Sequence, residues 1–143
     1  MHRNMKNSCK EVEVLIKKFR GILVGSAAAA ENGIDVIPRD SDVVFGDETQ
    51  EMIAVLWLLE TGWRKTLIEV PREYMRDSRI VWRGQMVSLR GEKLDLFIGE
   101  VRESCDGIAT NMCVLRAHVR KIQTWEAAEA CPYVQKLLKA IAC

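Results

Sequence analysis

One short, wholly apolar run between two helix-forming segments constrains the fold of this chain more than any other feature. Apolar residues recur at helical spacing over residues 8–20, so a helix is expected there. Ile22–Val24 follows and ends at Gly25-Ser26, as a buried strand that breaks into a turn would. Ala27–Glu31 is strong helix-forming sequence that Asn32-Gly33 closes. The predicted unit is therefore helix, strand, Gly-Ser turn and short helix.

Signals at the helix ends give the expected boundaries. Ser8–Glu11 has the pattern of a capping box for the first helix, which Gly21 is expected to stop. Ser26 is the expected N-cap of the short helix, by its hydroxyl. Asp47–Gln50 has the pattern of a second capping box, and Gly62 is expected to close the helix that follows it.

The rest of the sequence predicts strands followed by helices. Gly84 and Gly91 are expected to be turns between strands. The strands are expected over residues 40–45, 63–70, 80–82, 86–89 and 93–98. Residues 111–120 are ambiguous between strand and helix. Thr124 is expected to cap a short helix that Pro132 interrupts, and an amphipathic helix is expected to end the chain. A single α+β domain is the economical interpretation.

Composition excludes several classes of protein. The 143 residues carry 21 lysines and arginines against 20 aspartates and glutamates, and this balance excludes a strongly basic nucleic-acid clamp. The longest apolar run, Ile53–Leu59, is far shorter than the ~20 residues that span a bilayer, so no membrane association is expected. Five cysteines without a C-x-x-C pair favour free thiols and a cytoplasmic location, with a bridge from Cys105 to Cys113 as the alternative.

Three acidic residues are candidates for a metal site. Asp40 and Asp42 stand two residues apart at the head of an expected strand, so their side chains point to one face. Asp95 alternates with leucines in a later strand and is expected on the face opposite to them. Carboxylates are the oxygen ligands that Mg²⁺ requires, and two such ions can clamp the oxygens of a phosphoryl displacement. The alternative is that Asp40 and Asp42 simply begin a solvated strand.

These motifs occur in an order that resembles a known family. Residues 23–26, 32–34 and 39–44 resemble the signature of the polymerase-β-like nucleotidyltransferase superfamily, in particular its branch of abortive-infection toxins and related small proteins. Leu58–Trp63 is similar to the end of the family's next helix, and Gly91–Phe97 to its third-carboxylate strand. The resemblance covers about residues 12–100. It implies a nucleotidyltransferase-like domain over residues 1–110, with a mixed central sheet and helices packed on it, and a C-terminal extension over 111–143.

The resemblance also implies the roles of individual residues. Asp40, Asp42 and Asp95 would be the catalytic residues and would hold two Mg²⁺ ions. Gly25, Ser26 and Arg39 would contact the nucleoside triphosphate, for which ATP is expected. A nucleotidyl group would pass to an acceptor, either a tRNA, a protein or a small molecule, and pyrophosphate would leave.

Other functions stay open at this point. The chain could be a catalytically inactive member of the fold that acts as a binding or regulatory module, for example in a toxin–antitoxin pair. It could also be a nucleic-acid accessory protein that uses the basic stretch Arg76–Arg90. The apolar terminal helix suggests a homodimer as one oligomeric state.

Overall fold

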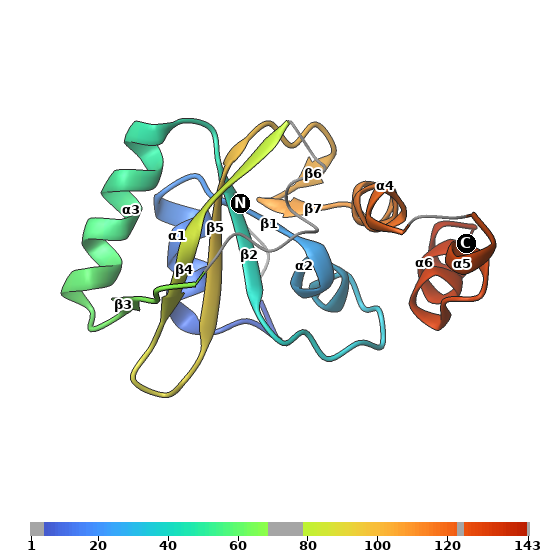
Figure 1. The fold of residues 1–143 in the computed structure, drawn as a ribbon, viewed down its shortest axis with the longest axis horizontal. Helices are drawn as coiled ribbons and strands as arrows, with labels where there is room; N and C mark the ends of the chain where they lie inside the picture. Colours follow the sequence, from blue (N-terminus) through green and yellow to red (C-terminus); the bar gives the residue numbers. More distant parts are fainter. Residues whose placement is uncertain (1–4, 69–78, 123–124, 143) are drawn as a thin grey trace.

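The computed structural model describes residues 5–68, 79–122 and 125–142 of the chain. In this part, a seven-stranded mixed sheet has the strand order β3-β4-β5-β2-β1-β7-β6 and carries helices on both faces (Figure 1). The predicted α+β class is therefore confirmed. The strands are β1 Ile22–Val24, β2 Ser41–Phe45, β3 Arg64–Lys65, β4 Ile80–Val87, β5 Lys93–Gly99, β6 Ser104–Cys105 and β7 Ile108–Ala109. The helices are α1 Lys10–Lys18, α2 Gly25–Glu31, α3 Glu48–Glu60, α4 Asn111–Lys121, α5 Trp125–Glu129 and α6 Pro132–Ala142.

Different helices cover the two faces of the sheet. A Cβ atom on Gly21 would lie 2.6 Å from Val43 Cγ1, so the Val43 side chain points toward the end of α1. The rings of Phe19 and Trp57 lie 5.4 Å apart, so α3 packs beside α1 on this side, the α1/α3 face. Side chains alternate along a strand, so Asp42 points to the opposite side, the α2/α4 face (Figure 1).

One row of residues crosses the centre of the sheet. Val24 of β1 lies opposite Asp42 of the antiparallel β2, and Asp42 lies opposite Asp95 of the parallel β5. Asp95 in turn lies opposite Gln85 of the antiparallel β4. Directly paired residues of neighbouring strands point to the same face, so all four side chains belong to the α2/α4 face.

Helix α2 is a thin layer between the sheet and α4. Each residue of Ala27–Ala30 is at most 6% exposed. The helix contacts β1, β2 and β7 on one side and α4 on the other. As predicted, it ends at Asn32-Gly33, where the Ile34 N–H donates to the Ala29 carbonyl at 3.0 Å. Since alanine carries only a methyl group, α4 packs close to the sheet.

The first helix starts and ends differently from its prediction. It has no capping box, because the Ser8 hydroxyl donates to Glu31 Oε2 at 3.1 Å instead. Glu31 also accepts the backbone N–H of Lys6 at 2.8 Å, so the segment before α1 is tied to the end of α2. After the helix, Arg20 has a φ of 60° and takes the left-handed position that usually favours glycine. Gly21 instead gives the chain room to pass the sheet.

The other two predicted helix starts have opposite outcomes. Ser26 is not the N-cap of α2, because the extended backbone ends at Val24 and the helix begins one residue before the serine. By contrast, Asp47 Oδ1 accepts the Gln50 N–H at 2.8 Å, so the predicted cap of α3 is confirmed. Gly62 follows the end of that helix, also as predicted.

Two strand predictions are corrected. Gly84 is not a turn: the predicted strands on either side of it are one strand, β4, with a bulge between Trp82 and Gly84. Gly84 has a φ of 144°, and a glycine inside a strand often marks such a bulge. The strand predicted over 63–70 is limited to the short β3, and residues 69 and 70 lie outside the described part. Gly91 lies in the hairpin between β4 and β5, as predicted.

The ambiguous segment 111–120 is a helix. Thr110 Oγ1 accepts the Cys113 N–H at 3.2 Å and caps α4. Pro132 begins α6, a position in which proline loses no hydrogen bond, while the expected cap Thr124 lies outside the described residues. The apolar side chains of Val134 and Leu137 are fully buried, so α6 is amphipathic as predicted but keeps these two side chains inside the molecule.

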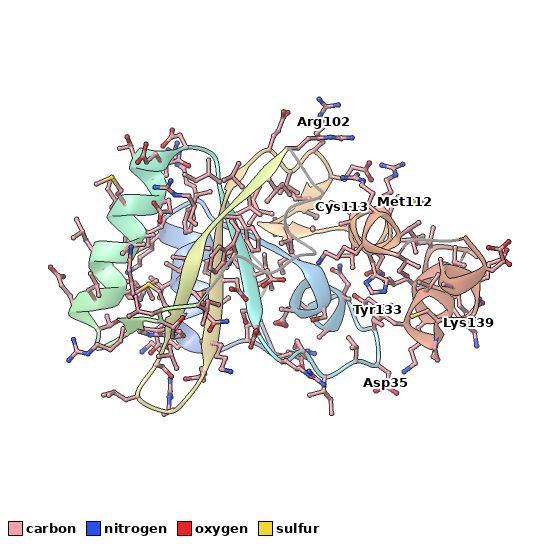
Figure 2. All side chains as sticks on the ribbon, viewed as in Figure 1. Asp35, Arg102, Met112, Cys113, Tyr133 and Lys139 are labelled. Atoms are coloured by element: carbon pink, nitrogen blue, oxygen red, sulfur yellow. The ribbon has the colours of Figure 1, made fainter. Side chains whose placement is uncertain are left out.

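Helix α6 also contacts the loop before β2. Lys136 Nζ donates to the Asp35 carbonyl at 2.7 Å, and Figure 2 labels Asp35 on this loop. The four described cysteines are free, as expected, which excludes the bridge from Cys105 to Cys113. Within the described residues, no helix combines the length and the apolar character needed to cross a bilayer.

Candidate functional site

Asp42 and Asp95 lie side by side at the centre of the sheet. They are direct partners in the parallel ladder between β2 and β5, so both carboxyls point to the α2/α4 face. Asp40 lies just before β2, and its negative charge raises the pKa of both other aspartates. The structure therefore pairs Asp42 directly with Asp95 and places Asp40 near enough for its charge to act on both.

Burial and mutual repulsion prevent this pair from carrying two charges. The pKa of Asp42 is raised to about 8, first by burial and then by the charge of Asp95. The pKa of Asp95 is also raised, again mainly by burial, and its residue is 3% exposed. Lys121 on α4 acts in the opposite direction and lowers the pKa of Asp42. At neutral pH the pair therefore shares a proton, in a hydrogen bond that Asp42 donates to Asp95.

Asp42 also has an unused acceptor and open space beside it. Its Oδ1 atom is buried and has no hydrogen-bond partner among the described residues. Gly25 faces the same carboxyl with a φ of 66°, and a Cβ atom there would lie 2.8 Å from Asp42 Oδ2. A buried acceptor without a donor costs about 1–3 kcal/mol, so the folded chain keeps this carboxyl at a cost. A cation or a ligand donor would offset that cost.

A β-bulge directs two donors at Asp95. Trp82 Nε1–H donates to Asp95 Oδ1 at 3.0 Å, and Gln85 Nε2 donates to the same oxygen at 3.5 Å. Residues three apart in a regular strand point to opposite faces, but the bulge at Gly84 adds one residue and brings both donors to the α2/α4 face. Both hydrogen bonds lower the pKa of Asp95 and so oppose part of the effect of burial.

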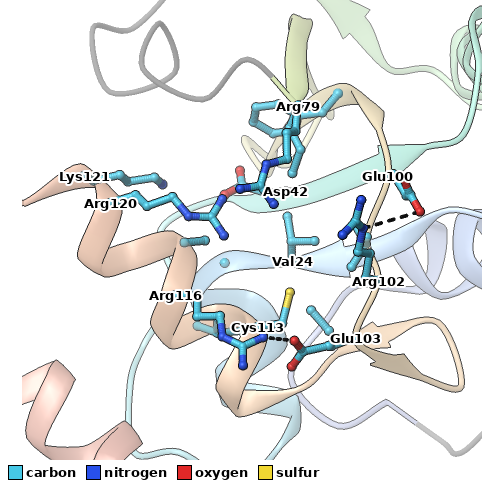
Figure 3. A pocket seen from close by; sticks show the side chains of 17 residues that line it. Val24, Asp42, Arg79, Glu100, Arg102, Glu103, Cys113, Arg116, Arg120 and Lys121 are labelled. Atoms are coloured by element: carbon cyan, nitrogen blue, oxygen red, sulfur yellow. Dashed lines mark ion pairs between the residues drawn. The ribbon is translucent and has the colours of Figure 1, made fainter.

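A cavity of about 630 Å³ opens beside Asp42, between the sheet and α4 (Figure 3). Val24, Gly25 and Asp42 line it on the side of the sheet. Its volume lies within the ~300–1,000 Å³ range of sites for small molecules. The other walls carry Arg79, Arg120 and Lys121, and two ion pairs, Arg102 with Glu100 and Arg116 with Glu103.

The sequence-predicted contact residues are not all part of this cavity. Gly25 and Asp42 line it, whereas Ser26, Arg39 and Asp40 do not. Asp95, the partner of Asp42 in the next strand, is 3% exposed and does not line the cavity either. No group of three or more His, Cys, Asp or Glu side chains suited to one metal ion is preformed in the part of the chain that the structure describes.

Two groups of residues at this site were missed by the sequence analysis. The basic side chains of α4 were missed because the sequence of residues 111–120 was ambiguous between strand and helix. In the helix, Arg116 and Arg120 lie one turn apart and therefore on the same side. The donors Trp82 and Gln85 were missed because Gly84, between two strand-like runs, predicts a turn. A glycine inside an otherwise strand-like run is the signal that could have found them.

The basic stretch that suggested nucleic-acid binding is divided by ion pairs. Arg83 pairs with Glu48 at 3.2 Å, and Arg90 pairs with Glu92 at 2.8 Å. Arg79 faces the cavity, and Arg76 lies outside the described residues. The described arginines of this stretch therefore do not form one continuous basic surface.

Comparisons with known proteins add no further constraint on this site. The chain matches no family model, and no curated protein or solved structure matches it. The resemblance to nucleotidyltransferases therefore stays a prediction from the residues themselves.

Proposed function

We propose that the chain has a nucleotidyltransferase-like fold, binds a nucleoside triphosphate with Mg²⁺ in the cavity beside Asp42, and transfers a nucleotidyl group to an acceptor. The observation that carries this proposal is that Asp42, the direct partner of Asp95, lines a cavity whose other walls carry Arg79, Arg120 and Lys121. Phosphates require cations around them, and transfer of a phosphoryl group requires carboxylates that hold metal ions near the reacting phosphorus. The cavity offers both.

One buried oxygen at the site suits Mg²⁺. Asp42 Oδ1 is a buried oxygen without a donor among the described residues, and carboxylate oxygens are the ligands that this ion prefers. Asp42 and Asp95 would hold the ion, with Asp40 beside them. When bound, Mg²⁺ supplies positive charge at the phosphates. With a cation in place the pair no longer needs its shared proton, so Asp95 becomes able to accept one.

The chain's own residues would position the reactants. Arg120 and Lys121 would hold the terminal phosphates, and Gly25 would leave room for the reacting phosphate beside Asp42. An acceptor hydroxyl would attack this phosphorus in line, so that the new O–P bond forms as the bond to pyrophosphate breaks. Its proton would go to Asp95, whose Oδ1 is held by Trp82 and whose second oxygen is the acceptor.

Binding and turnover of Mg²⁺-ATP test this proposal. By titration calorimetry we expect saturable binding by the wild type and at least tenfold weaker binding by Asp42→Asn. Asp47→Asn is the matched control, because it makes the same chemical change at the cap of α3, where asparagine also caps well. Equal binding by Asp42→Asn and the wild type would contradict the proposal.

A catalytically inactive binding module is the second candidate, and one observation favours it. Asp95 is 3% exposed and its Oδ1 is occupied by Trp82, so the second carboxylate of the pair is sequestered. Release of pyrophosphate from Mg²⁺-ATP, measured with candidate acceptors, separates the two functions. Nucleotide binding that depends on Asp42 but yields no pyrophosphate would support the binding module.

A further inference from the structure

Helix α3 lies at the edge of the molecule (Figure 1), and several of its large apolar side chains are exposed. Met52, Ile53, Leu56 and Leu59, here called the α3 stripe, are 53%, 52%, 60% and 39% exposed. The inner side of the helix is apolar too, and Leu58 there is fully buried. A helix that is apolar on all sides is normally buried on all sides, so the stripe indicates an interaction surface.

The apolar surface continues from α3 onto the hairpin between β4 and β5. Leu89 in this hairpin is 88% exposed. Its Cδ1 atom lies 3.7 Å from where a Cβ of Gly62, just after α3, would be. Leu89 therefore extends the α3 stripe at its Leu59 end. Single exposed apolar residues are normal on a protein, but a contiguous patch marks a binding surface.

Opposite charges lie at the two ends of the stripe. Glu48 begins α3 and its side chain is 67% exposed although it pairs with Arg83, while Arg64 and Lys65 are exposed just after the other end of the helix and outnumber the exposed Glu60 there. If a second α3 runs antiparallel to the first, the acidic end of each copy faces the basic end of the other. Met52 then faces Leu59 of the second copy. A parallel arrangement would place like charges together.

We propose that two copies of this chain associate through antiparallel α3 helices related by a two-fold axis. Such a contact uses the same patch twice and needs a self-complementary surface, which the stripe and its charged ends provide. Four helix residues and Leu89 fall short of the ~800 Å² per partner of a standard interface, so the dimer is weak, with a dissociation constant on the order of micromolar. The stripe lies on the α1/α3 face, so dimerisation leaves the cavity open and is independent of the proposed catalysis.

Sedimentation velocity over a range of concentrations tests the dimer. We expect the wild type to shift from monomer to dimer across the micromolar range, and Leu56→Glu to stay monomeric at concentrations at least tenfold higher. Ile37→Glu is the control, because Ile37 is an exposed apolar residue outside the stripe, in the loop before β2. A wild type that stays monomeric up to several hundred micromolar overturns the proposal, and so does a Leu56→Glu dimer as stable as that of the wild type.

Charge reversal tests the antiparallel direction. Lys65→Glu and Glu48→Lys should each weaken the dimer, and the double variant should recover most of the lost affinity. In Glu48→Lys, Arg83 keeps Glu51 as an ion-pair partner at 3.7 Å, so the fold is retained, and circular dichroism checks this. Recovery supports the antiparallel pairing. A double variant that is weaker than both single variants overturns it.

Discussion

The two faces of the central sheet use neighbouring residues of the same strands for opposite purposes. On the α1/α3 face, Val43, Leu94 and Leu96 are at most 2% exposed and stabilise the fold by burial. On the α2/α4 face, Asp42 and Asp95 of the same two strands share a proton, and their burial destabilises the fold. The same two strands therefore bury apolar side chains on one face and hold carboxyls at a cost in stability on the other, as is common where a binding site must be kept ready.

Shortening a core side chain should have the largest effect. Leu94→Ala should lower the free energy of unfolding by about 3–5 kcal/mol, because it leaves a cavity in the apolar core at a fully buried position. Asp95→Asn, one residue away, should change it far less, since it removes a buried charge and keeps the shape. Urea denaturation at pH 7 measures both. If the two variants lose similar stability, the division between the faces is wrong.

The stability of the fold should depend on pH through Asp42. In the folded chain this carboxyl holds its proton up to a pKa of about 8, whereas its usual pKa is 3.8. Between these values the folded state binds more protons than the unfolded state, so stability falls as pH rises, by up to about 1.4 kcal/mol per pH unit for one proton. Asp40 and Asp95 strengthen this effect and Lys121 weakens it.

Denaturation of Asp42→Asn at several pH values isolates that contribution. The variant cannot ionise at residue 42, so the fall of stability between pH 5 and 8 should become shallower than in the wild type. Asp47→Asn, which removes an exposed carboxylate at the cap of α3, should keep the slope of the wild type. An unchanged slope in Asp42→Asn would show that this carboxyl is ionised in the folded chain at neutral pH.

Removing the indole donor should have the smallest effect of the three. Trp82→Phe keeps an aromatic ring but leaves Asp95 Oδ1 with only the longer hydrogen bond from Gln85. We expect a loss of about 1–2 kcal/mol at neutral pH and a further rise in the pKa of Asp95, because the lost donor favoured its charged form. Urea denaturation at pH 5 and pH 8 measures this, and the loss should be larger at pH 8. An equal loss at both values contradicts a role for the indole in holding the charge.

Local signals in the sequence were sufficient for much of the fold. The apolar run of β1, the glycine stop after α2 and the Asp47 cap of α3 all depend on residues within a few positions of one another. A short stretch of sequence therefore contains the physical cause of each of these features. The role of Ser8 could not be predicted in this way, because its hydroxyl donates to Glu31, which lies 23 residues away along the chain.

The site depends on contacts between residues that are far apart along the chain. The face of Asp42 and that of Asp95 could each be predicted from strand alternation, but their direct pairing is set by the register between β2 and β5. The bulge that directs Trp82 toward Asp95 depends on the pairing of β4 with β5. The pKa of Asp42 depends in addition on burial, which is a property of the whole fold.

The run Ala27–Ala30 has a consequence for the dimensions of the cavity. Because Ala27–Ala30 offer only methyl groups to their neighbours, a layer of main chain and methyl groups separates α4 from the sheet. A longer side chain at Ala28 or Ala29, both fully buried, would act as a spacer. It would move Arg120 and Lys121 away from Asp42 without altering any of these three residues. The width between the acidic and the basic wall is thus a quantity that single substitutions in an otherwise featureless helix can tune.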